Sequence, residues 1–161
     1  MPHVVPVRAI VPHRERLAEV LEVARSQPAI SLNLGTFWAT SRKHAASPVG
    51  CLLGHYVHHK QPQHLTLVPL NFLEQVKVPL LAAQLFRKYP NREWRHYTLH
   101  YQGPEVEAWG LNAACLYFNL RAFDAQRLFW PPGHSYALEL SASLVVGMLE
   151  RFVKTEEALN P

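Results

Sequence analysis

The sequence predicts a mainly α fold of the α+β class, with five or six helices and one small antiparallel β-hairpin. Three observations predict it. In several segments apolar residues recur at intervals of three and four, the spacing of one face of a helix. Two short segments alternate in the way typical of strands. No strand–helix–strand succession is found, so a parallel sheet is not expected.

Composition indicates a single globular domain over residues 1–161. Hydrophobic residues make up 48% of the chain and charged residues 17%, which favours a packed core over disorder. A formal net charge of +4 produces only a weak positive potential on a chain of this length. It permits contact with nucleic acid without requiring it. Two cysteines are too few for a disulfide framework, so we expect free thiols in a soluble, cytoplasmic protein. Neither a signal peptide nor a membrane span of ~20 apolar residues is expected.

The N-terminal third is predicted to hold an extended arm and two helices. Three prolines in residues 1–12 exclude a helix there. Apolar residues at i, i+3, i+4 and i+7 predict a helix over 14–26. Serine followed by proline at Ser47-Pro48 is a typical helix start, so we expect a second helix over 47–59. Between the two helices, residues 31–47 are predicted to be irregular.

The remaining chain is predicted to form the hairpin and further helices. Residues 64–70 and 94–103 are β-prone and are expected to pair with each other. Val106 and Trp109 are expected on the buried stripe of the helix that follows the hairpin. The helices expected after residue 70 cover about 79–89, 104–118, 122–129 and 135–158.

The helix predicted over 47–59 carries two separate stripes. At 100° per residue, its apolar side chains gather on one face, as core residues do. The nearly opposite face carries its cysteine and three histidines: Cys51, His55, His58 and His59. Gly50 and Gly54 lie between the stripes and would let another backbone approach closely.

This Cys/His stripe permits two kinds of chemistry and one structural interpretation. His55 and His59, at i and i+4, are spaced to hold zinc, but Tyr56 stands where zinc proteases have glutamate. Cys51 lies near a helix N-terminus, which lowers a thiol pKa, and with His55 as base it is a candidate nucleophile. We favour the structural interpretation, in which the cysteine packs in the core and the histidines face solvent or a partner.

Two other segments are candidate binding sites. In the strand Arg92-Tyr101, cationic and aromatic side chains alternate, a pattern that can stack bases and hold phosphates but is also common in ordinary sheets. Its candidate binding residues are Arg95, His96, Tyr97, His100 and Tyr101. Farther on, Trp130 and Tyr136 flank a Pro-Pro-Gly turn and could line an aromatic pocket.

Three segments of the chain resemble a group of short bacterial and bacteriophage proteins of uncharacterised function. The first unit of that group is a Phe-x-Met/Leu-x-x-Trp segment, the second a Cys-Gly-Thr-x-x-Cys-x-x-Gly-(His/Trp) helix start, and the third an Ala…Leu-Phe unit. Ser47 stands near the position of the first cysteine, so a paired-cysteine role does not carry over. The resemblance implies a small accessory protein, phage-borne or on a mobile element. The matching residues are Leu34, Phe37 and Trp38; Cys51, Gly54 and His55; and Ala114, Phe118, Leu120, Ala125, Leu128 and Phe129.

From these patterns we expect a non-catalytic binding module for a partner protein or a small ligand, such as an accessory protein that modulates a host protein. One alternative is an enzyme that uses Cys51 with His55, or zinc held by His55 and His59. Another is a nucleic-acid-binding protein that uses the strand Arg92-Tyr101. No cofactor is expected outside the zinc alternative.

Overall fold

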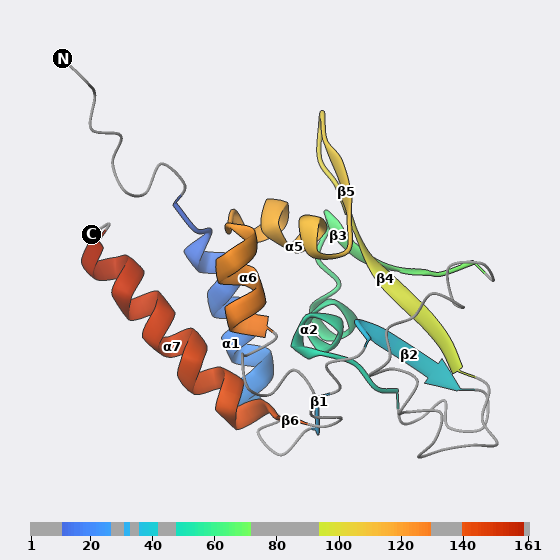
Figure 1. Cartoon of the computed structure of the whole chain (residues 1–161), viewed down its shortest axis with the longest axis horizontal. Coiled ribbons are helices and arrows are strands. Elements are labelled where there is room, and N and C mark those ends of the chain that lie inside the picture. The colour runs from blue at the N-terminus through green and yellow to red at the C-terminus, as the bar shows by residue number, and fades with distance from the viewer. Residues whose placement is uncertain are drawn as a thin grey trace.

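The chain forms a mixed α+β fold in which helices pack beside an antiparallel sheet (Figure 1). The described residues contain five helices, in line with the prediction, but the sheet has four strands where the sequence predicts a hairpin. No helix among them is long and apolar enough to cross a membrane. The computed structural model describes residues 11–26, 31–32, 36–41, 48–71, 94–129 and 140–159.

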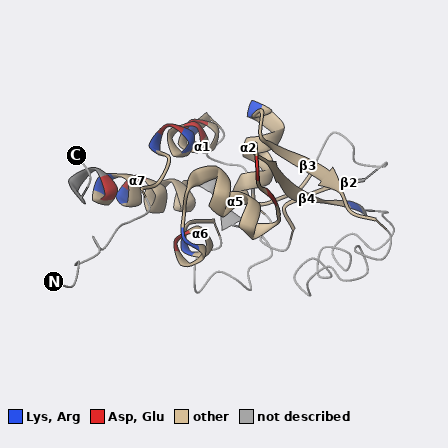
Figure 2. Cartoon of the chain, turned by 90° about the horizontal axis from the view of Figure 1, so that it is seen from above, with Lys and Arg blue, Asp and Glu red and all other residues tan. Residues whose placement is uncertain are grey.

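Three helices form one side of the molecule. α1 spans Arg14–Ser26 and α6 spans Ala122–Phe129, both as predicted, and α7 spans Ala142–Leu159. α1 buries its apolar stripe against α7, where Val145 and Leu149 are also buried. Figure 2 shows α1 and α6 on opposite sides of the molecule, with charged residues on both and on α7.

β4 (Trp94–Gln102) is the central strand of the sheet. β3 (Leu65–Pro69) pairs antiparallel with one edge of β4, which confirms the predicted pairing. On the other edge, β2 (Trp38–Ser41) pairs with the first residues of β4, and β5 (Glu107–Trp109) pairs with its last residues. Neither β2 nor β5 is predicted from the sequence, because each is short and its pairing partner is on another strand.

α2 spans Leu52–Lys60, so the prediction that Ser47-Pro48 starts this helix is wrong. Val49 instead forms a β-bridge with Ala39, through two backbone hydrogen bonds of 2.7 and 3.0 Å. Backbone pairing with a distant strand therefore overrides the local capping preference. Cys51, in an extended conformation, takes the N-cap position.

The helix predicted over 104–118 is also wrong in its first half, since α5 spans only Leu111–Phe118. Residues 107–109 are extended because their backbone pairs with β4. Gly110, with a φ of +61°, turns the chain from β5 into α5, a conformation that favours glycine. Val106 and Trp109 consequently lie at the surface, although the sequence predicts them in the core.

The helix predicted over 135–158 begins later than expected, since Leu140 and Ser141 are not helical. Leu140–Ser141 form strand β6, which pairs with β1 (Ser31–Leu32) as a separate two-stranded sheet. Residues 31–47 are therefore not wholly irregular, since they contain β1 and β2. Several predictions lie outside the described residues: the arm over 1–10, the helix over 79–89, residues 135–139, Trp130 and Tyr136.

The core lies between the sheet and the helices, and α2 is at its centre. Every residue from Cys51 to Val57 is buried. Large, fully buried side chains from both layers pack into this core, among them Leu53, Tyr56, Leu65, Leu99, Phe118 and Phe129. Because α2 is enclosed on most sides, its Cys/His stripe must meet another element.

Candidate functional site

The Cys/His stripe of α2 lies against Trp38 of β2. The indole of Trp38 stacks on the imidazole of His58, with ring centroids 4.8 Å apart and planes at 25°. His55 meets the same indole edge-on, with centroids 5.0 Å apart. The stripe is therefore divided: Cys51 and His55 are buried, whereas His58 and His59 are exposed.

Two glycines permit this close packing, as the sequence predicts. A Cβ placed on Gly54 would lie 1.8 Å from the carbonyl oxygen of Phe37, and one on Gly50 would lie 2.3 Å from it. The backbone N–H of Cys51 also donates to the carbonyl of Thr36, at 3.1 Å. The chain just before β2 thus runs directly over the start of α2, where only glycine leaves room for it.

Burial sets the protonation states of this cluster. It raises the pKa of the Cys51 thiol to about 11, the opposite direction from that of an activated nucleophile. Burial, together with the nearby His59 and His58, lowers the pKa of His55 to about 4. At neutral pH the pair is a thiol beside a neutral imidazole, and the Nε2 of His55 has no hydrogen-bond partner within the described part of the chain.

A metal ion at the stripe would need further ligands. The rings of His55 and His59 have centroids 6.5 Å apart. Over the described ranges, no group of three or more His, Cys, Asp and Glu side chains is arranged to hold a metal ion. The two candidate zinc ligands therefore gain no third ligand from those ranges.

The candidate binding residues of β4 do not form one surface. Arg95 is exposed, and Tyr97 and Tyr101 are partly buried on the same face of the strand. His96, on the opposite face, is buried, with its Nδ1 3.0 Å from the hydroxyl of Thr36. Burial lowers the pKa of His96. The first residue of the candidate segment, Arg92, lies outside the described residues.

His100 of β4 contacts two side chains of β5. Its imidazole stacks on the indole of Trp109 in β5, with centroids 4.1 Å apart. The Nε2 of His100 also lies 3.1 Å from a carboxylate oxygen of Glu107. Trp109 itself is about half exposed, so the aromatic stack ends at the surface.

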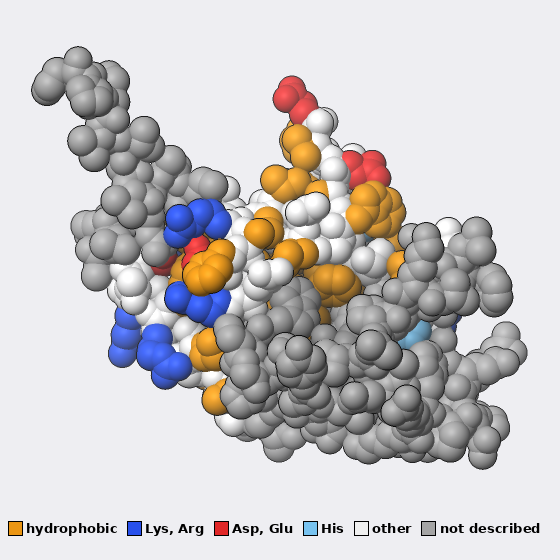
Figure 3. Space-filling model, in the orientation of Figure 1, with side chains coloured by type: hydrophobic (Ala, Val, Ile, Leu, Met, Phe, Trp, Pro, Cys, Tyr) orange, Lys and Arg blue, Asp and Glu red, His pale blue; other side chains and the backbone are white. Residues whose placement is uncertain are grey.

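Large exposed apolar side chains also occur on α5 and α6, the two helices that follow the hairpin. We call the apolar face the surface formed by four residues that are between 42% and 68% exposed: Val106, Trp109, Leu116 and Phe123. They come from the β4–β5 hairpin, α5 and α6, over which Figure 3 shows hydrophobic side chains on one side of the molecule. Such groups of exposed apolar residues mark interaction surfaces.

Sequence patterns do not identify the apolar face. Trp109 fits a helical stripe that the structure does not form. Phe123 offers a usable signal, since it lies off the stripe on which Ala125 and Leu128 turn α6 toward the core. An aromatic residue on the wrong side of an amphipathic helix is the pattern that indicates exposure.

The two ends of the apolar face carry opposite charges. Glu105 and Glu107 belong to the hairpin, Arg127 belongs to α6, and Arg121 lies immediately before that helix. Figure 3 shows acidic side chains over the hairpin and basic ones over the other end. The guanidinium of Arg127 lies over the ring of Phe123, 5.6 Å from its centroid. Arg121 is half exposed, with its Nε 3.3 Å from a carboxylate oxygen of Asp124.

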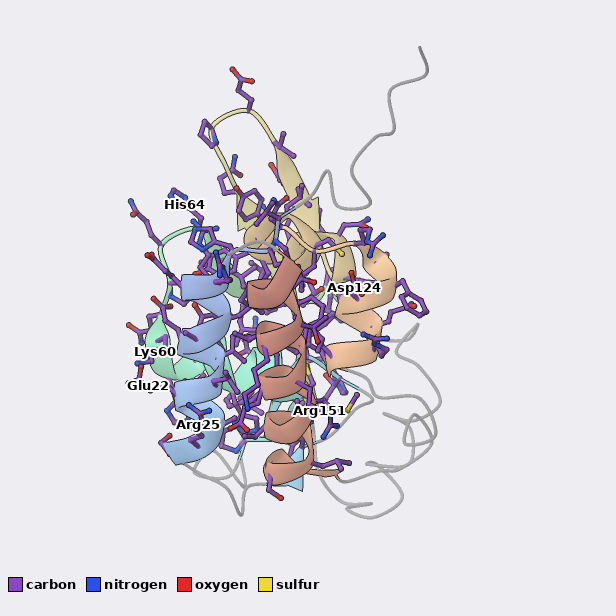
Figure 4. All side chains as sticks on the ribbon, turned by 90° about the vertical axis from the view of Figure 1, so that its left-hand side faces the viewer. Glu22, Arg25, Lys60, His64, Asp124 and Arg151 are labelled. Carbon is purple, nitrogen blue, oxygen red and sulfur yellow. The ribbon has the colours of Figure 1, made fainter. Side chains whose placement is uncertain are left out.

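A polar cleft lies between α1, the end of α2 and α5. Its volume is about 500 Å³. Lys60 and Glu22 form an ion pair at 2.9 Å across one part of it, and Figure 4 shows both residues and His64 along the same side of α1. The residues that line this α1–α2 cleft are Arg16, Glu19, Glu22, Lys60, Pro62, Gln63, His64 and Tyr117.

Hydrogen bonds hold the wall of the α1–α2 cleft in place. The hydroxyl of Tyr56 donates to the Glu19 carboxylate at 2.7 Å, and the hydroxyls of Tyr56 and Tyr117 are 2.9 Å apart. Arg16 donates to the carbonyl of Tyr117 at 2.6 Å, and its guanidinium covers that ring. The cleft thus has fixed walls that carry both positive and negative groups.

Comparison with protein-family models, with curated proteins and with solved structures found no match to this chain.

Proposed function

We propose that this chain is a non-catalytic binding module that recognises a partner protein through the apolar face. The observation that carries the proposal is the exposure of Trp109 and Phe123, which belong to the hairpin and to α6. Figure 3 shows hydrophobic side chains over both elements on the same face of the molecule. Tryptophan and other large side chains supply much of the binding energy at protein interfaces. Full burial of a side chain such as Phe123 contributes roughly 1.5–3 kcal/mol.

The surroundings of the apolar face favour protein over nucleic acid. A stacking platform for bases needs positive charge along the backbone path. The stack of His100 with the half-exposed Trp109 has Glu107 in contact with it and Glu105 two residues earlier in the same hairpin. On β4, the cation Arg95 does not adjoin an exposed aromatic row, because Tyr97 is partly buried and Tyr101 packs against the core.

The enzyme alternative receives less support from the α2 stripe. A nucleophilic thiol must be reachable and readily ionised, whereas Cys51 is fully buried and its pKa is raised. His55, its candidate base, is held beneath Trp38. We therefore assign this cluster a packing role, consistent with a stoichiometric binding protein.

Site-specific photo-cross-linking tests the proposed function. A photoreactive phenylalanine analogue is placed at position 123 and, as a matched control, at the exposed position Ala18 on α1. The full chain is then irradiated in the cells that produce it. We expect a discrete protein adduct from position 123 and none from position 18. Absence of any protein adduct at position 123, with the variant folded, would contradict the proposal.

The α1–α2 cleft supports a second candidate function, the binding of a small zwitterionic ligand. Its lining places Arg16 and Lys60 near Glu19 and Glu22, so a carboxylate and an ammonium can each meet an opposite charge. Titration calorimetry with free amino acids tests this function. We expect Arg16→Gln to weaken binding and Arg14→Gln, on the same helix outside the cleft, to leave it unchanged.

A further inference from the structure

We infer that the apolar face binds a second copy of this chain across a two-fold axis. The inference rests on the proposed function, because it names the partner for the same surface. The apolar face is the centre of an asymmetric charge pattern, with carboxylates at the hairpin end and guanidinium groups at the α6 end (Figure 3). A suitable partner must carry an apolar centre with the opposite order of charges.

A second copy rotated by 180° has that order of charges. In a two-fold interface the same patch of both copies meets, so each residue i that contacts j has a symmetric counterpart. The α6 end of one copy then lies opposite the hairpin end of the other, and Arg127 and Arg121 approach Glu105 and Glu107. Opposite charges meet at both ends, and the apolar centres meet in the middle.

The hairpin is shaped to make this contact. It projects beyond the body of the molecule (Figure 1), and the hydrogen bond from Gly103 N–H to the carbonyl of Val106, at 2.9 Å, closes its turn. β5 is anchored to β4 by the pairing of His100 with Trp109 and of Gln102 with Glu107. A fixed, projecting hairpin with Val106 half exposed can reach α6 of a second copy without refolding.

Sedimentation equilibrium of the full chain with exchanged charges tests the two-fold interface. Glu105→Arg and Arg127→Glu each place like charges together at both ends of the interface. We expect each single variant to weaken the dimer roughly tenfold, as two screened ion pairs become repulsions. The double variant E105R/R127E reverses both ends and should restore the affinity of the natural chain to within roughly threefold.

Two further variants distinguish a loss of the dimer interface from a loss of folding. Glu15→Arg, on α1 at the opposite side of the molecule from α6, is the matched charge reversal and should leave the dimer unchanged (Figure 2). Phe123→Ser changes a side chain that is mostly exposed, so it should abolish the dimer while circular dichroism and the melting temperature stay as they are.

Three results would contradict a second copy as the partner. The natural chain could stay monomeric at its highest attainable concentration, or its dimer could be unaffected by both single charge reversals. The third result is a double variant that dimerises no more tightly than the single variants. The photo-cross-link at position 123 shows whether such a result also contradicts the proposed function. An adduct with a different protein from monomeric chain overturns only the two-fold dimer. Monomeric chain with no adduct overturns both proposals.

Discussion

The imidazole of His55 in α2 lies edge-on against the indole of Trp38 in β2, with ring centroids 5.0 Å apart and planes at 86°. This contact joins the central helix to the edge of the sheet. Both side chains are buried, and the exposed His58 stacks on the same indole. The pair keeps the imidazole of His55 buried at the junction of the helix and the sheet.

Removal of the indole should destabilise the fold strongly. Trp38→Ala deletes a buried aromatic side chain and leaves a cavity, so we expect the free energy of unfolding to fall by about 3–5 kcal/mol. Trp38→Phe keeps an aromatic ring against His55 and should cost less than half as much. Urea denaturation followed by circular dichroism measures both. Equal losses for the two variants would show that the aromatic contact is not what stabilises this region.

His55 should make the protein less stable in mild acid. Its pKa of about 4 in the folded chain lies below the unfolded value of 6.5, so protons bind the unfolded chain more tightly. The stabilisation is complete above pH 6.5 and is lost as the pH falls toward 4, by about 3 kcal/mol. The lowered pKa of His96 acts in the same direction.

Denaturation of His55→Phe across pH 7 to pH 4 measures this contribution. We expect a shallower loss of stability than in the natural chain. His64→Gln, on the loop after α2, is the matched control and should keep the natural slope. An unchanged slope in His55→Phe would contradict the assignment.

Gly54 should tolerate no side chain, in contrast to Gly147. A Cβ on Gly54 would overlap the Phe37 carbonyl oxygen, which is backbone and cannot swing away. We expect Gly54→Ala to lower the free energy of unfolding by about 3 kcal/mol. A Cβ on Gly147 in α7 would meet only the end of Arg151, at 3.7 Å, so Gly147→Ala should stabilise the helix by about 0.5–1 kcal/mol. Thermal melts of both variants give the comparison.

The two cysteines should react at very different rates. Cys51 is fully buried, which raises its pKa to about 11, whereas Cys115 is partly exposed, although burial raises its pKa too. In native protein at pH 8 we expect iodoacetamide to modify Cys115 first, and Cys51 only after the chain unfolds. Peptide mass mapping over time identifies the sites. Rapid modification of Cys51 in folded protein would revive the nucleophile hypothesis.

The sequence by itself determined the elements whose signals are local. α1 and α6 follow from apolar residues at helical spacing, and the pairing of β3 with β4 follows from two β-prone segments. The two stripes of α2 also follow from spacing, as does the close approach at Gly50 and Gly54. These features depend on residues a few positions apart, which the sequence displays directly.

Tertiary structure decided every feature that needs a partner distant in the chain. Residues 107–109 became a strand because β4 offered backbone groups to pair with, and Val49 left its predicted helix to pair with Ala39. The Cys/His stripe of α2 was divided because the chain at Thr36 and Phe37, distant in sequence, packs over its first half. Trp109 belongs to the apolar face because the pairing of β5 with β4 leaves its side chain at the surface. Helical spacing states which side chains share a face, but only the packed chain determines what that face meets.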